Sequence, residues 1–144
     1  MHPARKKVQQ AISSVVIPKL RSLGFKGSMP HFRRIIESRA DLLTFQFNLS
    51  SGSFVVELAS CGQDDVERHR RADLELKTVT AHDMNIRRRL GSSSPGGDHW
   101  FVYGKRNYEP GHEQVLPDAD YERIAHDVVS LLDEQAVSWW QARR

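Results

Sequence analysis

The sequence predicts an α+β fold, in which an antiparallel sheet of about five strands has the N- and C-terminal helices packed on one face. Three observations support this prediction. Apolar residues recur at helical spacing at both ends of the chain, apolar and polar residues alternate in its middle, and glycine-bearing turns join the alternating runs. Strands do not alternate with long helices, which argues against a parallel sheet. At 144 residues, we expect a single domain over residues 1–144.

Residues 4–23 are predicted to form the first helix. The apolar residues at helical spacing are Val8, Ile12, Val15, Val16, Leu20 and Leu23. Pro18 is expected to kink the last turn or to restart it, because proline has no backbone N–H to donate. Gly24 is expected to end the helix in the left-handed conformation, which costs glycine little.

Five strands are predicted to follow, over residues 31–37, 42–50, 54–59, 82–90 and 100–103. The second and third alternate most regularly and flank the turn sequence Ser51-Gly52-Ser53, which predicts an antiparallel hairpin. In the fourth strand, Met84, Ile86 and Leu90 are expected to point inward, whereas Arg87 and Arg89 point outward.

Two further segments complete the predicted domain. Residues 62–80 mix opposite charges at high density, which is typical of a solvated loop or a short surface helix. Pro117-Asp118 is expected to open the closing helix, with Asp118 as a candidate N-cap. The predicted buried stripe of this helix is Tyr121, Ile124, Ala125, Val128, Leu132, Ala136 and Trp139. We expect at most one ring of the pair Trp139-Trp140 to be buried against the sheet.

Composition favours a cytoplasmic protein that does not enter a membrane. No apolar run approaches the roughly 20 residues that a membrane span requires, and the basic N-terminus lacks the apolar core of a signal peptide. The single cysteine, Cys61, cannot form an internal disulfide.

The charge distribution is asymmetric, although the net charge is only +3. Residues 1–34 contain eight lysines and arginines and no acidic residue, whereas the closing helix is rich in aspartate and glutamate. This asymmetry is compatible with nucleic-acid binding. We favour the alternative that the basic first helix lies beside the acidic last helix, which requires no external partner.

Several short motifs occur in a characteristic order between residues 12 and 103. They are Leu20-x-x-Leu23-Gly24-Phe25-Lys26, Phe32-Arg33-Arg34, Phe45-Gln46-x-Asn48, Gly52-x-Phe54-x-Val56, Arg87-x-Arg89-Leu90-Gly91 and Asp98-x-Trp100. With them the chain resembles a bacterial family known as domain of unknown function 4304. It departs from the family at the position where its members favour paired aromatics, since it has Trp100-Phe101. The resemblance implies an α+β fold and a bacterial cytoplasmic setting, and it brings no catalytic residues.

The polar face of the predicted sheet is the candidate binding site. The residues expected to point away from the helices are Arg33, Gln46, Asn48, Glu57, Arg87 and Arg89, with Trp100 and Tyr103 near them. Guanidinium and amide groups in this arrangement suit carboxylate or phosphate recognition. The alternative is a solvated outer face, in which Arg87 and Arg89 form an ion pair with Glu57. Arg88 is expected on the opposite face.

The sequence contains no recognisable catalytic or metal-binding motif. The seven histidines lack ligand spacing: His69 and His82 lie thirteen residues apart, as do His99 and His112. A dyad of His82 and Asp83 is disfavoured, because adjacent strand residues face opposite sides. No nucleotide-binding glycine motif is present, so we expect no cofactor and no metal, and we assign no catalytic residue.

Three functional hypotheses remain. The first is a binding or accessory module that recognises a protein or a small anionic ligand through the open sheet face. The second is a nucleic-acid-binding protein that uses residues 1–34 and the arginine strand, with an affinity that depends strongly on salt. The third is an enzyme, for which a histidine and a carboxylate would have to converge in a deep pocket.

Overall fold

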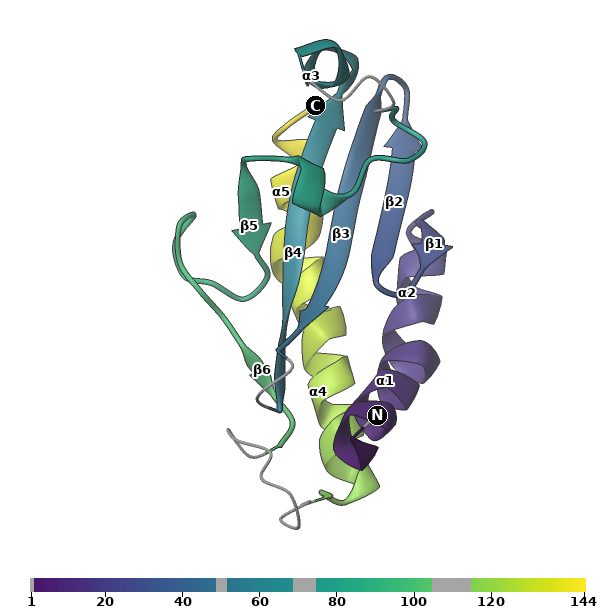
Figure 1. Cartoon of the computed structure of the whole chain (residues 1–144), viewed down its shortest axis with the longest axis vertical. Helices are drawn as coiled ribbons and strands as arrows, with labels where there is room; N and C mark the ends of the chain where they lie inside the picture. Colours follow the sequence, from purple (N-terminus) through teal and green to yellow (C-terminus); the bar gives the residue numbers. More distant parts are fainter. Residues whose placement is uncertain (1, 49–51, 69–74, 105–114) are drawn as a thin grey trace.

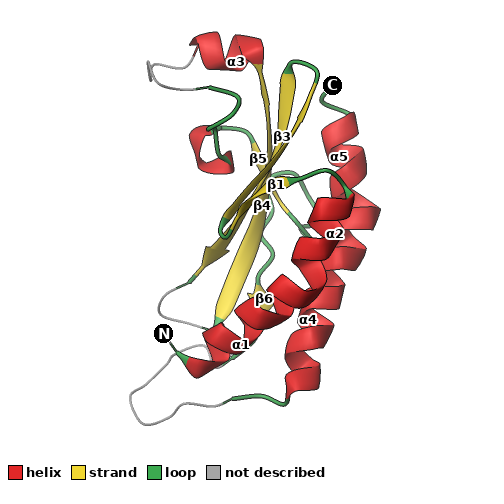
Figure 2. Ribbon diagram, turned by 90° about the vertical axis from the view of Figure 1, so that its right-hand side faces the viewer, coloured by secondary structure: helices red, strands yellow, loops and turns green. Residues whose placement is uncertain are grey.

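A computed structural model describes residues 2–48, 52–68, 75–104 and 115–144. Two long helices pack side by side on one face of an antiparallel sheet, and shorter elements lie on the other face (Figures 1 and 2). The α+β prediction is therefore confirmed. None of the described helices combines the length and apolar character needed to cross a bilayer.

Each terminal helix consists of two α-helical parts joined by a π-helical turn. The bounds are α1 Pro3–Ala11, η1 Ile12–Val16 and α2 Ile17–Ser22 at the N-terminus, and α4 Asp118–Leu131, η3 Leu132–Ala136 and α5 Val137–Gln141 at the C-terminus. In η1, the Ile17 N–H donates to the carbonyl of Ile12, five residues earlier. The regular α pattern is thus interrupted over Ile12–Val16 and resumes at Ile17, one residue before Pro18.

Among the described residues the sheet has six strands, in the order β1-β2-β3-β4-β5, with β6 also paired to β4. The strands are β1 Lys26–Ser28, β2 His31–Ile36, β3 Arg39–Phe47, β4 Ser53–Gly62, β5 Arg87–Arg89 and β6 Phe101–Val102. Phe47 pairs with Phe54 across the predicted hairpin. Strand β1 was not predicted. It begins at Lys26, two residues after Gly24 (φ +95°), which ends the first helix as expected.

The main core lies between the sheet and the helices. Phe45 of β3 and Val56 of β4 contact a stripe that includes Ile12 and Val128, all of them buried. The whole predicted stripe of the closing helix is buried as well. The N-cap position, however, is occupied by Pro117, and Asp118 is the first residue of α4.

Both C-terminal tryptophans are buried, whereas the sequence predicted at most one ring buried against the sheet. Trp140 packs on Phe25, with ring centroids 4.8 Å apart, and its Nε1 donates to the carbonyl of Ala59 (3.1 Å). Trp139 is covered from another side, since the Arg143 guanidinium lies 3.7 Å from its ring centroid. A side chain one helical turn away thus covers the ring that the sheet does not reach.

A second, smaller core covers one end of the opposite sheet face. Ala40, Leu42, Ala59 and Cys61 are buried there beneath residues 75–84, which we call the strap. Strap residues Val79 and Ala81 belong to this core, and Leu76 and Met84 pack against it. The strap includes the short helix η2 (Ala81–Asp83), and α3 (Gln63–Arg68) lies next to it (Figure 2). The far face is therefore open only in part.

The strap corrects two predictions about residues 62–90. Part of the charged segment is helical, as expected, but its apolar residues seal a core instead of lying in a solvated loop. The fourth strand is also shorter than predicted. It begins at Arg87, so the inward alternation does not reach Ile86, which is 74% exposed.

Candidate functional site

Glu57 is the centre of a polar cluster on the far face of the sheet. It lies in the middle of β4, where its neighbours Val56 and Leu58 point into the main core, and only 4% of it is exposed. In the register of β4 and β5, Glu57 pairs with Arg89 and Ala59 pairs with Arg87. Both arginines therefore reach the same face.

Arg87 and Arg89 both form ion pairs with Glu57. Arg87 Nη1 lies 3.0 Å from Oε2, and Arg89 Nε lies 3.3 Å from Oε1. The ion pair proposed from the sequence is thus confirmed. A buried carboxylate without partners is costly, so the two arginines stabilise Glu57. The same ion pairs hold the two arginines in place.

Asp98 and Trp100 extend the cluster beyond the sheet. Asp98 accepts hydrogen bonds from Arg89 Nη1 (2.5 Å) and from Trp100 Nε1 (2.8 Å). The Arg89 guanidinium lies 5.4 Å from the Trp100 ring centroid, within cation–π range. Desolvation acts to raise the pKa of Asp98, but the hydrogen bonds from Trp100 and Arg89 and the charge of Arg89 lower it overall.

Two histidines that the sequence did not connect lie on the other side of Glu57. His82 Nε2 is 3.6 Å from Glu57 Oε2, and the rings of His82 and His31 meet edge to face at 5.5 Å. His31 Nδ1 lies 2.8 Å from the hydroxyl of buried Thr44, its register partner on β3. Burial lowers the pKa of His31, and the charges of His82 and Arg33 lower it further.

Asp83 does not act as the partner of His82. Its carboxylate accepts the backbone N–H of Thr80 (2.9 Å) and so caps the short helix η2. Only the pairing of β2 with β3 and the path of the strap bring His31 and His82 together, and no local motif signals either contact.

An open depression of about 370 Å³ adjoins the arginines. Its lining residues are Glu57, Asn85, Arg87, Arg89, Pro95, Gly96, Gly97 and Asp98. Two guanidinium groups face two carboxylates, so the lining is close to electroneutral. Such a surface presents fixed donors and acceptors and has no surplus positive charge for a free anion.

The other predicted site residues have different roles. Arg33 donates from Nε and Nη2 to the carbonyl of Val79 (3.3 and 3.1 Å) and thereby fastens the strap. Gln46 is exposed beyond the strap, and Asn48 is half-buried at the end of β3, where its N–H bonds to Ser53. Tyr103 was wrongly placed on this face: it is fully buried in the main core against Phe54.

The cluster has no metal-binding arrangement. Within the described part of the chain, no three histidine, cysteine, aspartate or glutamate side chains are arranged to hold a metal ion. His69 and His112 lie outside the described residues. Cys61 is not an activated nucleophile, because burial raises the pKa of its thiol to about 11.

The basic first helix faces the acidic last helix, as we favoured from the sequence. Lys7 Nζ lies 2.7 Å from Asp118 Oδ1, and Lys19 Nζ lies 2.8 Å from Asp133 Oδ1. These lysines are therefore paired within the chain.

A family model described as "Domain of unknown function (DUF4304)" matches residues 16–142, which is most of the chain. This match agrees with the resemblance carried by the sequence motifs. No curated protein and no solved structure matches the chain.

Proposed function

The chain belongs to the DUF4304 family, and from its own surface we infer that it is a binding module that docks a protein partner. The docking surface that we propose contains Arg87, Arg89 and Trp100 together with the depression beside them. The observation that carries the proposal is the fixing of both arginines by buried Glu57 next to a half-buried tryptophan.

A protein partner fits this surface better than a small free anion does. Arginine and tryptophan are the residues that most often dominate binding energy in protein interfaces, above all when they are held rigid. The arginines are already neutralised by Glu57 and Asp98, so a small anion would have to compete with two carboxylates. A protein surface can contact the indole ring and the remaining guanidinium N–H groups together.

The setting that we propose is the bacterial cytoplasm. The family resemblance supports it, and so does the lone buried thiol of Cys61, which needs no oxidising compartment.

The test is affinity capture from nuclease-treated lysate with the wild type, Trp100→Ala and Arg87→Lys/Arg89→Lys. The lysine variant keeps the positive charge beside Glu57 but loses the planar fork of donors, so the fold is maintained while directed contacts are lost. Lys26→Gln serves as the control, because Lys26 is an exposed cation on β1, at the opposite edge of the sheet from β5.

We expect one protein to be captured by the wild type and the control, and lost in the other two variants. Direct binding is then measured with the purified partner, where Trp100→Ala should weaken the affinity about tenfold or more. Equal capture by all four proteins would refute this surface, and capture that disappears with nuclease treatment would favour the nucleic-acid alternative.

A further inference from the structure

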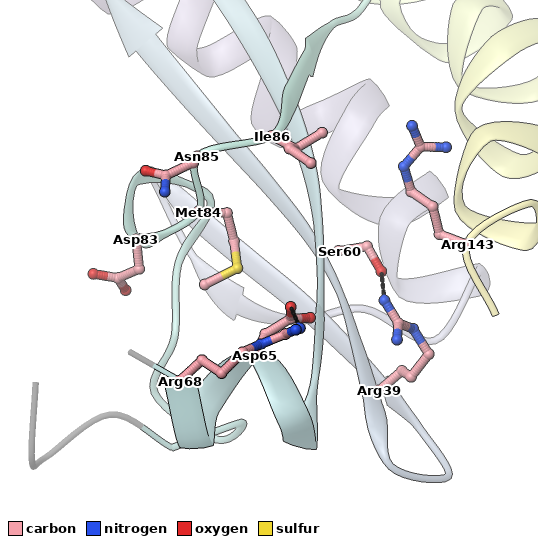
Figure 3. A pocket seen from close by; sticks show the side chains of 9 residues that line it. All are labelled: Arg39, Ser60, Asp65, Arg68, Asp83, Met84, Asn85, Ile86 and Arg143. Atoms are coloured by element: carbon pink, nitrogen blue, oxygen red, sulfur yellow. Dashed lines mark hydrogen bonds and ion pairs between the residues drawn. The ribbon is translucent and has the colours of Figure 1, made fainter. Parts of the chain in front are cut away.

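The sheet has a notch on the other side of β5, away from the depression. Strand β5 pairs with β4 only as far as Ala59, whereas β4 continues to Gly62. The segment before β5 departs from the sheet, and the space left at the edge of β4 is a cavity of about 390 Å³ (Figure 3). This volume lies within the range of small-molecule pockets.

Two of the arginines that line this notch lie on the helix side of the sheet, and a third arginine lies near one of them. Arg39 and Arg143 line it, on the same side of β4 as Ser60 (Figure 3). Arg88, whose register partner Leu58 points into the main core, is near enough for its charge to affect Arg143. Desolvation lowers the pKa of Arg143, and the charge of Arg88 lowers it further.

These arginines differ from Arg87 and Arg89 in their partners. No carboxylate of a described residue forms an ion pair with Arg39, Arg88 or Arg143. The two carboxylates that line the notch are engaged elsewhere: Asp65 binds Arg68 and the Gly62 N–H, and Asp83 caps η2.

Hydrogen-bond donors are left over as well. Among the described residues, the buried Nε atoms of Arg39 and Arg88 have no acceptor. The Ser60 hydroxyl accepts from Arg39 Nη2 (2.9 Å), which leaves its own hydrogen to donate. Unpaired buried donors are costly, so the donors of Arg39 and Ser60 at this notch favour an oxygen-rich anion.

We propose that the notch binds a small organic oxyanion, with a phosphate or carboxylate group beside Arg39 and Ser60 and with Arg143, which also donates to the carbonyl of Trp139, on the same side of β4. Ile86 forms the apolar part of the rim and is largely exposed. An apolar moiety attached to the anionic group would cover this side chain. The notch adjoins the docking surface of Arg87, Arg89 and Trp100 at Asn85, which lines both hollows, but it uses other arginines.

The experiment is calorimetric titration at constant ionic strength with inorganic phosphate, phenyl phosphate and benzoate. We expect phenyl phosphate to bind about fivefold more tightly than phosphate, because its ring covers Ile86. Comparing it with benzoate distinguishes phosphate from carboxylate recognition. Ile86→Ser should abolish the advantage of phenyl phosphate over phosphate and leave phosphate binding unchanged.

Charge variants test the arginines directly. Arg39→Gln/Arg143→Gln should weaken binding by about tenfold or more, whereas the control Lys26→Gln/Arg123→Gln, which loses the same charge, should not. If the double variant does not fold, Arg143→Gln near the chain end replaces it. Absence of binding to all three probes, or equal loss in the control, would overturn the proposal. So would tighter binding of a single-stranded oligonucleotide that also requires Arg39 and Arg143, since it would identify the notch as a nucleic-acid surface.

Discussion

Glu57 and its two arginines form an ion cluster in which the partners are not equivalent. Glu57 is almost completely buried, whereas the side chains of Arg87 and Arg89 are 37% and 28% exposed. Removing the carboxylate would leave two arginines that can turn toward water. Removing the arginines would leave a buried charge with only His82 nearby.

Arg87→Ala/Arg89→Ala is therefore expected to lower the free energy of unfolding by about 3 kcal/mol, as is typical when a buried ion pair loses one side. Urea unfolding at pH 7 measures this loss. Adding Glu57→Gln to the same variant should recover part of it, because the uncompensated charge is removed. A loss no larger than that of a surface ion pair, below about 1 kcal/mol, would contradict the structural role of Glu57.

His31 makes stability depend on mildly acidic pH. Its pKa in the folded protein lies below the ordinary value of 6.5, so the unfolded chain binds the proton more readily. Stability is thus complete above pH 6.5 and should decrease as the pH falls below that value. Urea midpoints between pH 7.5 and 5 should decrease less in His31→Asn, whose amide can still bond to Thr44, and equal slopes would refute the assignment.

Cys61 should be inert in the native protein. It is buried under the strap and the pKa of its thiol is raised to about 11 by burial, so little thiolate exists at pH 8. We expect Ellman's reagent to react slowly with the native protein and at once with the urea-unfolded chain. Rapid native labelling would show that the strap opens readily.

At the scale of the elements, β1 depends on one backbone conformation. Gly27 has φ +112°, and a Cβ placed there would lie 2.5 Å from the backbone oxygen of His31 in the paired strand β2. Because this oxygen belongs to the main chain, no side-chain rotation relieves the contact.

Gly27→Ala should accordingly destabilise the protein by about 1–2 kcal/mol and release β1 from β2. Thermal unfolding gives the loss of stability, and amide exchange of the Lys26–Ser28 strand locates it. Ser28→Ala, at an exposed neighbouring position, is the control and should change little.

The strap is fastened to the sheet chiefly by Arg33 and a few apolar side chains. Its core is much smaller than the main core, so it should open without global unfolding. In Arg33→Ala we expect the Val79 amide to exchange about tenfold faster, while that of Leu58 in the main core is unchanged. Parallel acceleration at both amides would show that the two cores unfold together.

At the scale of the whole molecule, local patterns were enough to predict the helices, the β3–β4 hairpin and the shared face of Arg87 and Arg89. Each of these depends on residues close in sequence or on strict alternation. The strap could not be predicted in this way, because Val79 and Ala81 lie in a charged segment and find their apolar partners only in the folded sheet. The approach of His31 to His82 and the positions of Trp139 and Tyr103 depend in the same way on contacts distant in sequence.

The outermost strands of the described sheet are short, which affects the tendency of the protein to aggregate at high concentration. Along one edge of the sheet lies three-residue β1, and along the other lie β5 and β6, of three and two residues. Sheets of separate molecules can pair through exposed edge strands. Such pairing requires several consecutive backbone N–H and C=O groups without partners. Strand β3 is paired on both sides, and β4 is bordered in part by β5 and β6, so the described sheet offers only short free edges for amyloid-like growth.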